Sequence, residues 1–315
     1  MTPSASLSPV AAVTLLGLVI LLWGANWPVM KVGLEFISPL LFTGLRMLLG
    51  CLCMIIAAAV MGQLRRPYRD EWPLVFGVGL VQMALFMALV TIALQYVPAG
   101  RSSILAYTTS IWVLPLAALT LDEHLTRQRL VGFALGIGGV TVMFNPFGFD
   151  WSQPSVVIGN GLLLLAALCW ALLIVYVRAR RGQGPPLTLA PWQFGIAAVV
   201  LLPIAVVVED TSAVQWSNPT LIAILVYNGP LATAFSFWAM ITITRALPAV
   251  TTSIGSLGVP AFGLTASAVA LGEQLSATNV LGLLLIAAGV ATVTLANRHR
   301  EPAANPVVSK DSREP

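Results

Sequence analysis

Ten stretches dominated by apolar residues follow one another along the chain, separated by short segments rich in charge, Pro, Gly, Asn or Ser. They cover residues 11–30, 39–61, 72–95, 101–121, 129–145, 156–177, 189–208, 218–244, 249–271 and 278–296. A helix that crosses the hydrocarbon core of a bilayer needs about 20 mostly apolar residues. The pattern therefore predicts an all-α polytopic membrane protein with ten transmembrane helices.

Composition argues against a soluble protein. Of the 315 residues, 58% are hydrophobic and 9% charged, whereas about 25% of the residues of a soluble domain are charged. The net charge of +4 comes from basic residues between the apolar stretches, so it indicates topology rather than nucleic-acid binding. Cys51, Cys53 and Cys169 lie inside apolar stretches without a paired CxxC or a His cluster. We therefore expect no metal and no cofactor.

Lys and Arg alternate between the two sides of the predicted bundle. The loops after the second, fourth, sixth and eighth stretches, with the tail, hold 13 of the 16 basic residues, and Lys31 and Arg101 lie on the other side. Basic loops stay in the cytoplasm. We therefore expect an inner-membrane protein with a cytoplasmic N-terminus (1–10) and a disordered cytoplasmic tail (297–315).

The chain also matches itself at an offset of 150 residues. Pro98-Ala99 corresponds to Pro248-Ala249, Glu123 to Glu273, and Gly139 to Gly289. This predicts two five-helix repeats, 11–145 and 156–296. An odd number of spans inverts the second copy, so we expect two inverted repeats around a central cavity near the membrane midplane.

Several short motifs resemble those of a known family. They are Trp23-Gly24-Ala25-Asn26-Trp27, Arg46, the Pro-Ala pairs, and Leu-x-Glu-x-Leu around Glu123 and Glu273. With these motifs the chain resembles the EamA type of the drug/metabolite transporter superfamily, and in length and aromatic content it looks most similar to the aromatic amino-acid exporter branch. The resemblance implies ten helices in two inverted repeats and export of amino acids or related metabolites.

Arg46 is the ionisable residue that lies clearly within an apolar stretch. A charge at such depth is costly and marks a functional candidate. A guanidinium grips a carboxylate with two parallel hydrogen bonds, which predicts a substrate-binding residue. The alternative is a structural arginine that bonds helix-end carbonyls or an acid such as Glu35 or Glu273.

Other substrate-binding candidates are polar or aromatic residues at mid-depth. Tyr and Trp combine an apolar wall with a polar tip and attract cations, while a buried amide needs a partner or a water-filled cavity. The candidates are Trp23, Asn26, Gln82, Tyr107, Trp170, Tyr227, Asn228 and Ser253, with Trp27, Trp112, Trp238 and Ser256 beside them. For each of them, ordinary helix packing is the alternative.

Prolines within the apolar stretches free backbone carbonyls and mark gating hinges or static kinks. The candidates are Pro115, Pro230 and Pro260. Gly132-x-x-x-Gly136 indicates close helix contacts within the chain, with a homodimer face as the alternative to a monomer.

The sequence thus predicts export of small-molecule amino acids across the lipid bilayer by alternating access, with broad specificity. No Asp, Glu or His lies inside the stretches, which favours facilitated diffusion; Glu123 and Glu273 are the alternative for proton coupling. No nucleophile–base pair, metal-ligand set or phosphate loop is present, so an enzyme is not expected. Nucleosides, sugars and cationic compounds are the alternative substrates.

Overall fold

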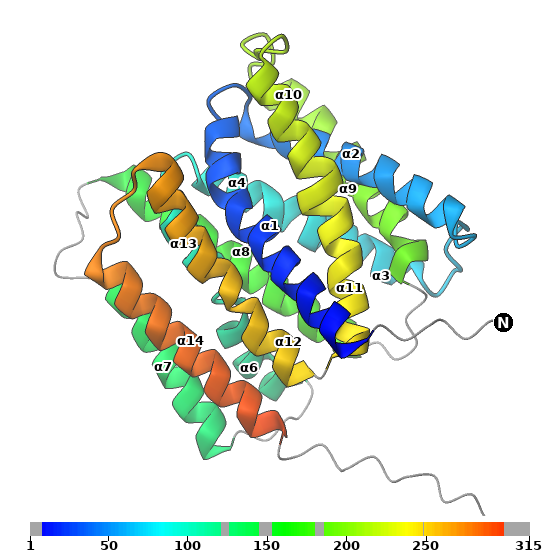
Figure 1. The fold of residues 1–315 in the computed structure, drawn as a ribbon. Coiled ribbons are helices and arrows are strands. Elements are labelled where there is room, and N and C mark those ends of the chain that lie inside the picture. The colour runs from blue at the N-terminus through cyan, green and yellow to red at the C-terminus, as the bar shows by residue number, and fades with distance from the viewer. Residues whose placement is uncertain (1–7, 121–125, 145–152, 180–185, 248, 299–315) are drawn as a thin grey trace, which may run out of the picture.

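The structure is a computed structural model that describes residues 8–120, 126–144, 153–179, 186–247 and 249–298. Over these residues it is a bundle of helices without a strand (Figure 1). The helices of the first half are α1 (Pro9–Gly33), α2 (Pro39–Val60), α3 (Trp72–Phe76), η1 (Gly77–Phe86), α4 (Met87–Ala93), α5 (Ala99–Ala106), α6 (Thr109–Thr120) and α7 (Arg127–Phe144). Those of the second half are α8 (Pro154–Ala179), α9 (Pro186–Val208), α10 (Pro219–Val226), η2 (Tyr227–Phe235), α11 (Ser236–Ala246), α12 (Ala249–Ser256), α13 (Gly258–Leu271) and α14 (Ala277–Arg298).

Every predicted stretch is helical over most of its described residues. In the described part of the chain, eight helical segments are long and apolar enough to cross a membrane. The ninth stretch contains the shorter apolar helix Gly258–Leu271, and α7 begins with two arginines in its first turn. A polytopic membrane protein agrees with these helices, while ten crossings and the bounds of the two repeats stay predictions. The predicted segments 1–10 and 297–315 lie mostly outside the described residues.

Departures from regular helix recur 150 residues apart. The π-helices η1 and η2 begin at Gly77 and Tyr227. The predicted stretches 101–121 and 249–271 are each broken, at Tyr107 and at Leu257. At the first break Thr108 donates to the Leu105 carbonyl at 2.7 Å, and such side-chain bonds compete with the helical ladder. These departures lie at equivalent positions of the two halves, which supports the predicted repeat. The inversion of the second repeat in a membrane stays a prediction.

The three predicted hinge prolines lie in different settings. Pro115 lies inside α6, which continues through it, and Pro230 lies inside η2. Pro260 lies in the first turn of α13, where backbone N–H groups have no acceptor within the helix, so the N–H that proline lacks costs no hydrogen bond. The break in that stretch therefore precedes Pro260. Their role as hinges stays a prediction.

Helices of the two halves pack on each other in pairs: α2 on α9, α7 on α14, and α1 on α13 (Figure 1). Glycines bring α7 and α14 together, because a Cβ at Gly289 would lie 2.5 Å from the Gly132 carbonyl oxygen and one at Gly139 would lie 2.8 Å from that of Gly282. These glycines thus serve contacts within the chain.

The bundle has two chemically distinct ends. The arginine-rich end carries Arg65, Arg66, Arg69, Arg127, Arg129 and Arg178, and α1 begins and α14 ends there (Figure 1). The carboxylate end carries Glu35, Glu209 and Glu273. There the Gln215 N–H donates to the Phe36 carbonyl at 3.2 Å, which joins the start of α10 to the end of α1.

Candidate functional site

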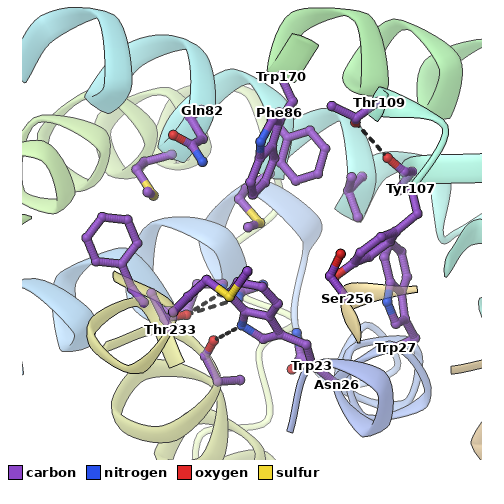
Figure 2. Close-up of a pocket in the computed structure, with 18 of the residues that line it drawn as sticks. Trp23, Asn26, Trp27, Gln82, Phe86, Tyr107, Thr109, Trp170, Thr233 and Ser256 are labelled. Atoms are coloured by element: carbon purple, nitrogen blue, oxygen red, sulfur yellow. Dashed lines mark hydrogen bonds between the residues drawn. The ribbon is translucent and has the colours of Figure 1, made fainter. Parts of the chain in front are cut away.

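A cavity of about 400 Å³ lies between the two halves of the described chain (Figure 2). In the first half its walls come from α1, α2, η1, α4, α5 and α6, and in the second from α8, α9, η2, α11 and α12. Because both halves contribute to one hollow, a movement of one half against the other would change its shape.

Six of the nine predicted substrate-binding residues line this cavity. They are Trp23, Asn26, Arg46, Gln82, Tyr107 and Trp170, and the additional candidates Trp27 and Ser256 also line it. Figure 2 shows Gln82 and Trp170 on one side of the hollow and Trp23 and Asn26 on another. Their role in binding substrate stays a proposal.

Tyr227 and Asn228 do not line the cavity. The Tyr227 hydroxyl donates to the Leu22 carbonyl at 2.5 Å, and the fully buried Asn228 amide donates to the Ile224 carbonyl at 3.2 Å. Both residues open η2, and the i→i+5 bonding of a π-helix changes which residues share a face. From η2, Ala232 and Thr233 reach the cavity instead.

Ser253, the remaining predicted residue, belongs to α12, but its side chain lies outside the described part of the structure. Ser256, about one turn further along α12, lines the cavity.

Arg46 is 2% exposed and fills part of the cavity wall. Its Nε and Nη2 donate to the Thr233 hydroxyl at 3.2 and 2.9 Å, and its Nη1 contacts the Met30 sulfur at 3.1 Å. A guanidinium has five N–H donors, so this set leaves donors for a further acceptor. Among the described residues no carboxylate forms an ion pair with Arg46.

Glu273, one of the two acids considered as a structural partner of Arg46, binds elsewhere. Its carboxylate accepts from the N–H groups of Ala99 at 2.6 Å and Gly100 at 2.9 Å. The other acid, Glu35, is exposed at the carboxylate end. The charge of Arg46 is therefore available to an anionic group that enters the cavity.

Aromatic and methionine side chains form most of the remaining wall. Phe86 and Trp170 meet edge to face with ring centroids 4.4 Å apart, and the Trp23 indole N–H donates to the Ala232 carbonyl at 2.9 Å. Five of the nine methionines line the cavity, namely Met30, Met47, Met83, Met87 and Met240. Methionine adapts its shape to its neighbours, so this wall suits substrates of different outline. These methionines and Thr233 were not predicted from the sequence, because apolar and hydroxyl side chains inside a helix carry no signal of the surface that they face.

The cavity opens toward the arginine-rich end. Thr244, near the end of α11, is an exposed lining residue. On the opposite side the lining residues Met30, Met47 and Val90 are 3%, 0% and 1% exposed. The exposures of these lining residues favour access to the site from the arginine-rich end.

The only ionisable side chains among the described lining residues are those of Arg46 and Tyr107. The lining holds no Asp, Glu or His, and the described residues contain no group of side chains suited to hold a metal ion. The side chains that are present can hold a ligand by hydrogen bonds, one positive charge and apolar contact.

Apolar helices around a cavity between two related halves are the arrangement expected of a membrane transporter. The sequence profile of the EamA-like transporter family matches residues 10–145 and 157–295, and the chain belongs to this family. The family predicted from the motifs is thereby confirmed, and it consists of transporters rather than enzymes.

Relatives carry names of the same kind. The chain is 30% identical to the uncharacterized transporter YvbV of Bacillus subtilis, over 92% of this chain and 93% of that protein. It is also 30% identical to a probable amino-acid metabolite efflux pump of Salmonella typhimurium, over 87% of this chain and 91% of the other. A solved crystal structure of a protein shares the fold with a TM-score of 0.63 and 22% identity, covering 94% of this chain and all of that one.

Proposed function

We propose that this protein exports amino acids from the cytoplasm, with broad specificity that includes aromatic ones. The observation that carries the proposal is Arg46, a buried guanidinium in the cavity wall without an acidic partner among the described residues. The Salmonella relative named a probable amino-acid metabolite efflux pump supports the same substrate class.

The site favours a substrate with a carboxylate. A charge-assisted hydrogen bond is worth about 1.5–3 kcal/mol, and the donors of Arg46 supply it. The same positive charge repels cationic compounds, while nucleosides and sugars bring no anion to meet it. Trp23, Trp27 and Trp170 offer flat apolar surfaces on which an aromatic side chain packs.

The contacts between the two halves at the carboxylate end agree with alternating access. Glu209 accepts from the N–H groups of Leu40 and Leu41 at 2.8 and 2.9 Å, so a carboxylate of the second half binds the start of α2. Glu273 does the same for the start of α5. We infer that these contacts close the outer gate, and that the positive-inside rule places the arginine-rich end and both termini in the cytoplasm, in the inner membrane.

Facilitated diffusion is the simplest mode for this cavity, since the described lining offers no carboxylate or imidazole to carry a proton. Proton coupling through Glu273 is the alternative. Its repeat counterpart Glu123 lies outside the described residues.

Flux of labelled phenylalanine, phenethylamine and uridine into proteoliposomes tests the proposal. We expect phenylalanine to move and Arg46→Gln to lower its flux at least about tenfold, because the variant loses a charge-assisted bond. Arg127→Gln, which removes an exposed arginine remote from the cavity, is the matched control and should leave flux unchanged.

Three results would contradict parts of this proposal. Transport of uridine or phenethylamine without phenylalanine refutes the substrate class. A loss of folded protein equal to the loss of flux in Arg46→Gln returns Arg46 to a structural role. A several-fold stimulation by an imposed pH gradient replaces facilitated diffusion with coupling.

A further inference from the structure

Asn26 carries a buried hydrogen-bond acceptor that its own chain does not use. The residue is 6% exposed and lines the cavity, and its Oδ1 has no hydrogen-bond partner in the described structure. An unmade bond at a buried polar atom costs about 1–3 kcal/mol. The other described amides with such an oxygen, Asn160 and Asn228, lie outside the lining. The Asn26 oxygen is shielded from solvent in this structure, so a ligand supplies the missing donor once the amide turns its oxygen toward the cavity that the residue lines.

The Asn26 acceptor lies close to the carboxylate-binding group proposed above. Asn26 precedes Met30 by four residues on α1, or about 6 Å along the helix axis. The Met30 sulfur lies 3.1 Å from Arg46 Nη1. One face of α1 therefore places the Asn26 oxygen near the Arg46 guanidinium. An α-amino acid carries the matching groups on one carbon: an ammonium that donates and a carboxylate that accepts. One hydrogen bond of about 2.9 Å from the ammonium to Asn26 and another from Arg46 to the carboxylate would span the distance between the two side chains.

The residues around Asn26 also suit a cation. Trp23 and Trp27 precede and follow it on the same helix, and both line the cavity (Figure 2). The Trp23 N–H is already bonded to Ala232, so its ring, rather than its polar tip, is what it offers a substrate. Tryptophan faces attract ammonium groups. Because the amide itself is neutral, the subsite stabilises an ammonium without cancelling the charge of Arg46.

Close helix packing fixes the orientation of this face. A Cβ at Gly24 would lie 2.6 Å from Phe262 Cδ1 on α13, so only glycine lets α1 approach so closely. The first helices of the two halves match at a slightly smaller offset of 147 residues, which pairs Trp23 with Trp170. At this offset Asn26 corresponds to Leu173, which is buried outside the lining. The acceptor therefore exists once in a duplicated scaffold, which gives the bound substrate one orientation.

From these contacts we propose that Asn26 Oδ1 accepts a hydrogen bond from the substrate ammonium and makes the site selective for zwitterions. The inference rests on the proposed function and deepens it. The cavity then discriminates against carboxylates that lack an amine as well as against amines that lack a carboxylate. Asn26 is the specificity-determining residue for the first of these distinctions.

A pair of substrates that differ only in the amine tests this role. Phenylalanine and 3-phenylpropanoate are compared in proteoliposome flux and in thermal stabilisation of the detergent-purified protein. Asn26→Leu keeps the volume and removes the acceptor, so we expect phenylalanine flux to fall about tenfold while 3-phenylpropanoate flux is unchanged. Asn160→Leu is the control, because it removes a buried unpartnered amide oxygen outside the cavity and should not alter the ratio of the two fluxes.

Asn26→Asp provides a second readout if Asn26→Leu does not fold. A carboxylate accepts from ammonium and repels another carboxylate, so we expect it to keep phenylalanine and lose 3-phenylpropanoate. An unchanged flux ratio in either variant overturns the inference. The proposed function is refuted by a different result, namely wild-type protein that does not transport phenylalanine. If Arg46→Gln lowers phenylalanine flux and the Asn26 substitutions do not, only the role of Asn26 is refuted.

Discussion

The two ends of the bundle are joined by different chemistry. At the carboxylate end, Glu209 and Glu273 of the second half bind backbone N–H groups at the starts of α2 and α5 in the first half. Among the described residues of the arginine-rich end, neutral hydrogen bonds link the halves: the Trp192 indole donates to the Arg65 carbonyl at 3.0 Å, and the Tyr176 hydroxyl donates to that of Pro73 at 3.1 Å.

This difference indicates which contacts between the two halves contribute most to the stability of the closed state. A carboxylate at a helix start gains two charge-assisted bonds and the favourable end of the helix dipole, but only while the helix end stays aligned with it. A neutral bond contributes about 0.5–1.5 kcal/mol. The lining residues Met30 and Val90, toward the strong contacts, are buried, whereas Thr244, toward the weak ones, is exposed, as expected if the carboxylates act as a gate.

The largest expected effect follows from removing one of these carboxylates. Glu273→Ala leaves the N–H groups of Ala99 and Gly100 without their acceptor, and a loss of about 1.4 kcal/mol already changes an equilibrium tenfold. We expect a cysteine placed at the buried lining position Val90 to react at least about tenfold faster with a membrane-impermeant thiol reagent added outside whole cells. Cys51, Cys53 and Cys169 are replaced beforehand to remove background labelling.

Glu35→Ala is the matched control for this experiment, since it removes an exposed carboxylate from the same end. It should leave the labelling rate near that of the parent. Glu273→Gln, which keeps one carbonyl acceptor without the charge, should give an intermediate rate. Equal rates for Glu273→Ala and Glu35→Ala would contradict a gating role for Glu273.

The sequence predicted the helices and part of the site for identifiable reasons. Long apolar runs locate helices because the bilayer demands them, and Trp23, Asn26 and Trp27 share a face because helical residues three and four apart do. All three line the cavity, on a regular stretch of α1 where this spacing holds.

The predicted residues that do not line the cavity, and the contacts that the sequence did not indicate, lie where helical geometry changes or where distant segments meet. Tyr227 and Asn228 were expected at the site on the basis of ordinary α-helical spacing, but they open a π-helix that presents Thr233 instead. The break at Tyr107 depends on side-chain bonds to the preceding turn, which apolar periodicity does not record. Glu273 was noted for coupling, and its bonds to the start of α5 were not foreseen, because a contact 173 residues away in sequence depends on tertiary packing.

A smaller effect is expected at the arginine-rich end. Trp192→Phe removes the donor to the Arg65 carbonyl and retains a ring against Trp72, whose centroid lies 5.8 Å away. Loss of one neutral bond should destabilise the purified protein by about 1 kcal/mol, measured by thermal or denaturant unfolding. The labelling rate of the Val90→Cys protein should not change.

Trp216→Phe, at a tryptophan that is 53% exposed, serves as the control for that substitution. If Trp192→Phe accelerated labelling at position 90 as much as Glu273→Ala does, the two ends would contribute equally to closure. The contrast between charged and neutral links would then carry no functional meaning.

The smallest effect concerns the ion pair that lies within one half. Arg65 binds Glu71 at 2.7 and 2.8 Å, and these bonds, with one from the Tyr68 N–H at 2.7 Å, lower the pKa of the Glu71 carboxyl below its usual 4.5. A carboxyl whose folded pKa is depressed stabilises the fold fully above its unfolded pKa, and this contribution disappears as the pH falls through the folded value. Glu71→Gln should therefore lower the Tm by about 1–2 °C near neutral pH, and the difference from wild type should shrink on acidification and vanish once the folded carboxyl is protonated. Asp70→Asn, at the adjacent exposed carboxylate, is the control, because it leaves the bonds between Arg65 and Glu71 in place. Because the side-chain bonds of Arg65 and Glu71 stay within the first half of the described chain, neither substitution should alter labelling at Val90→Cys; a change there would mean that the arginine-rich end also controls closure.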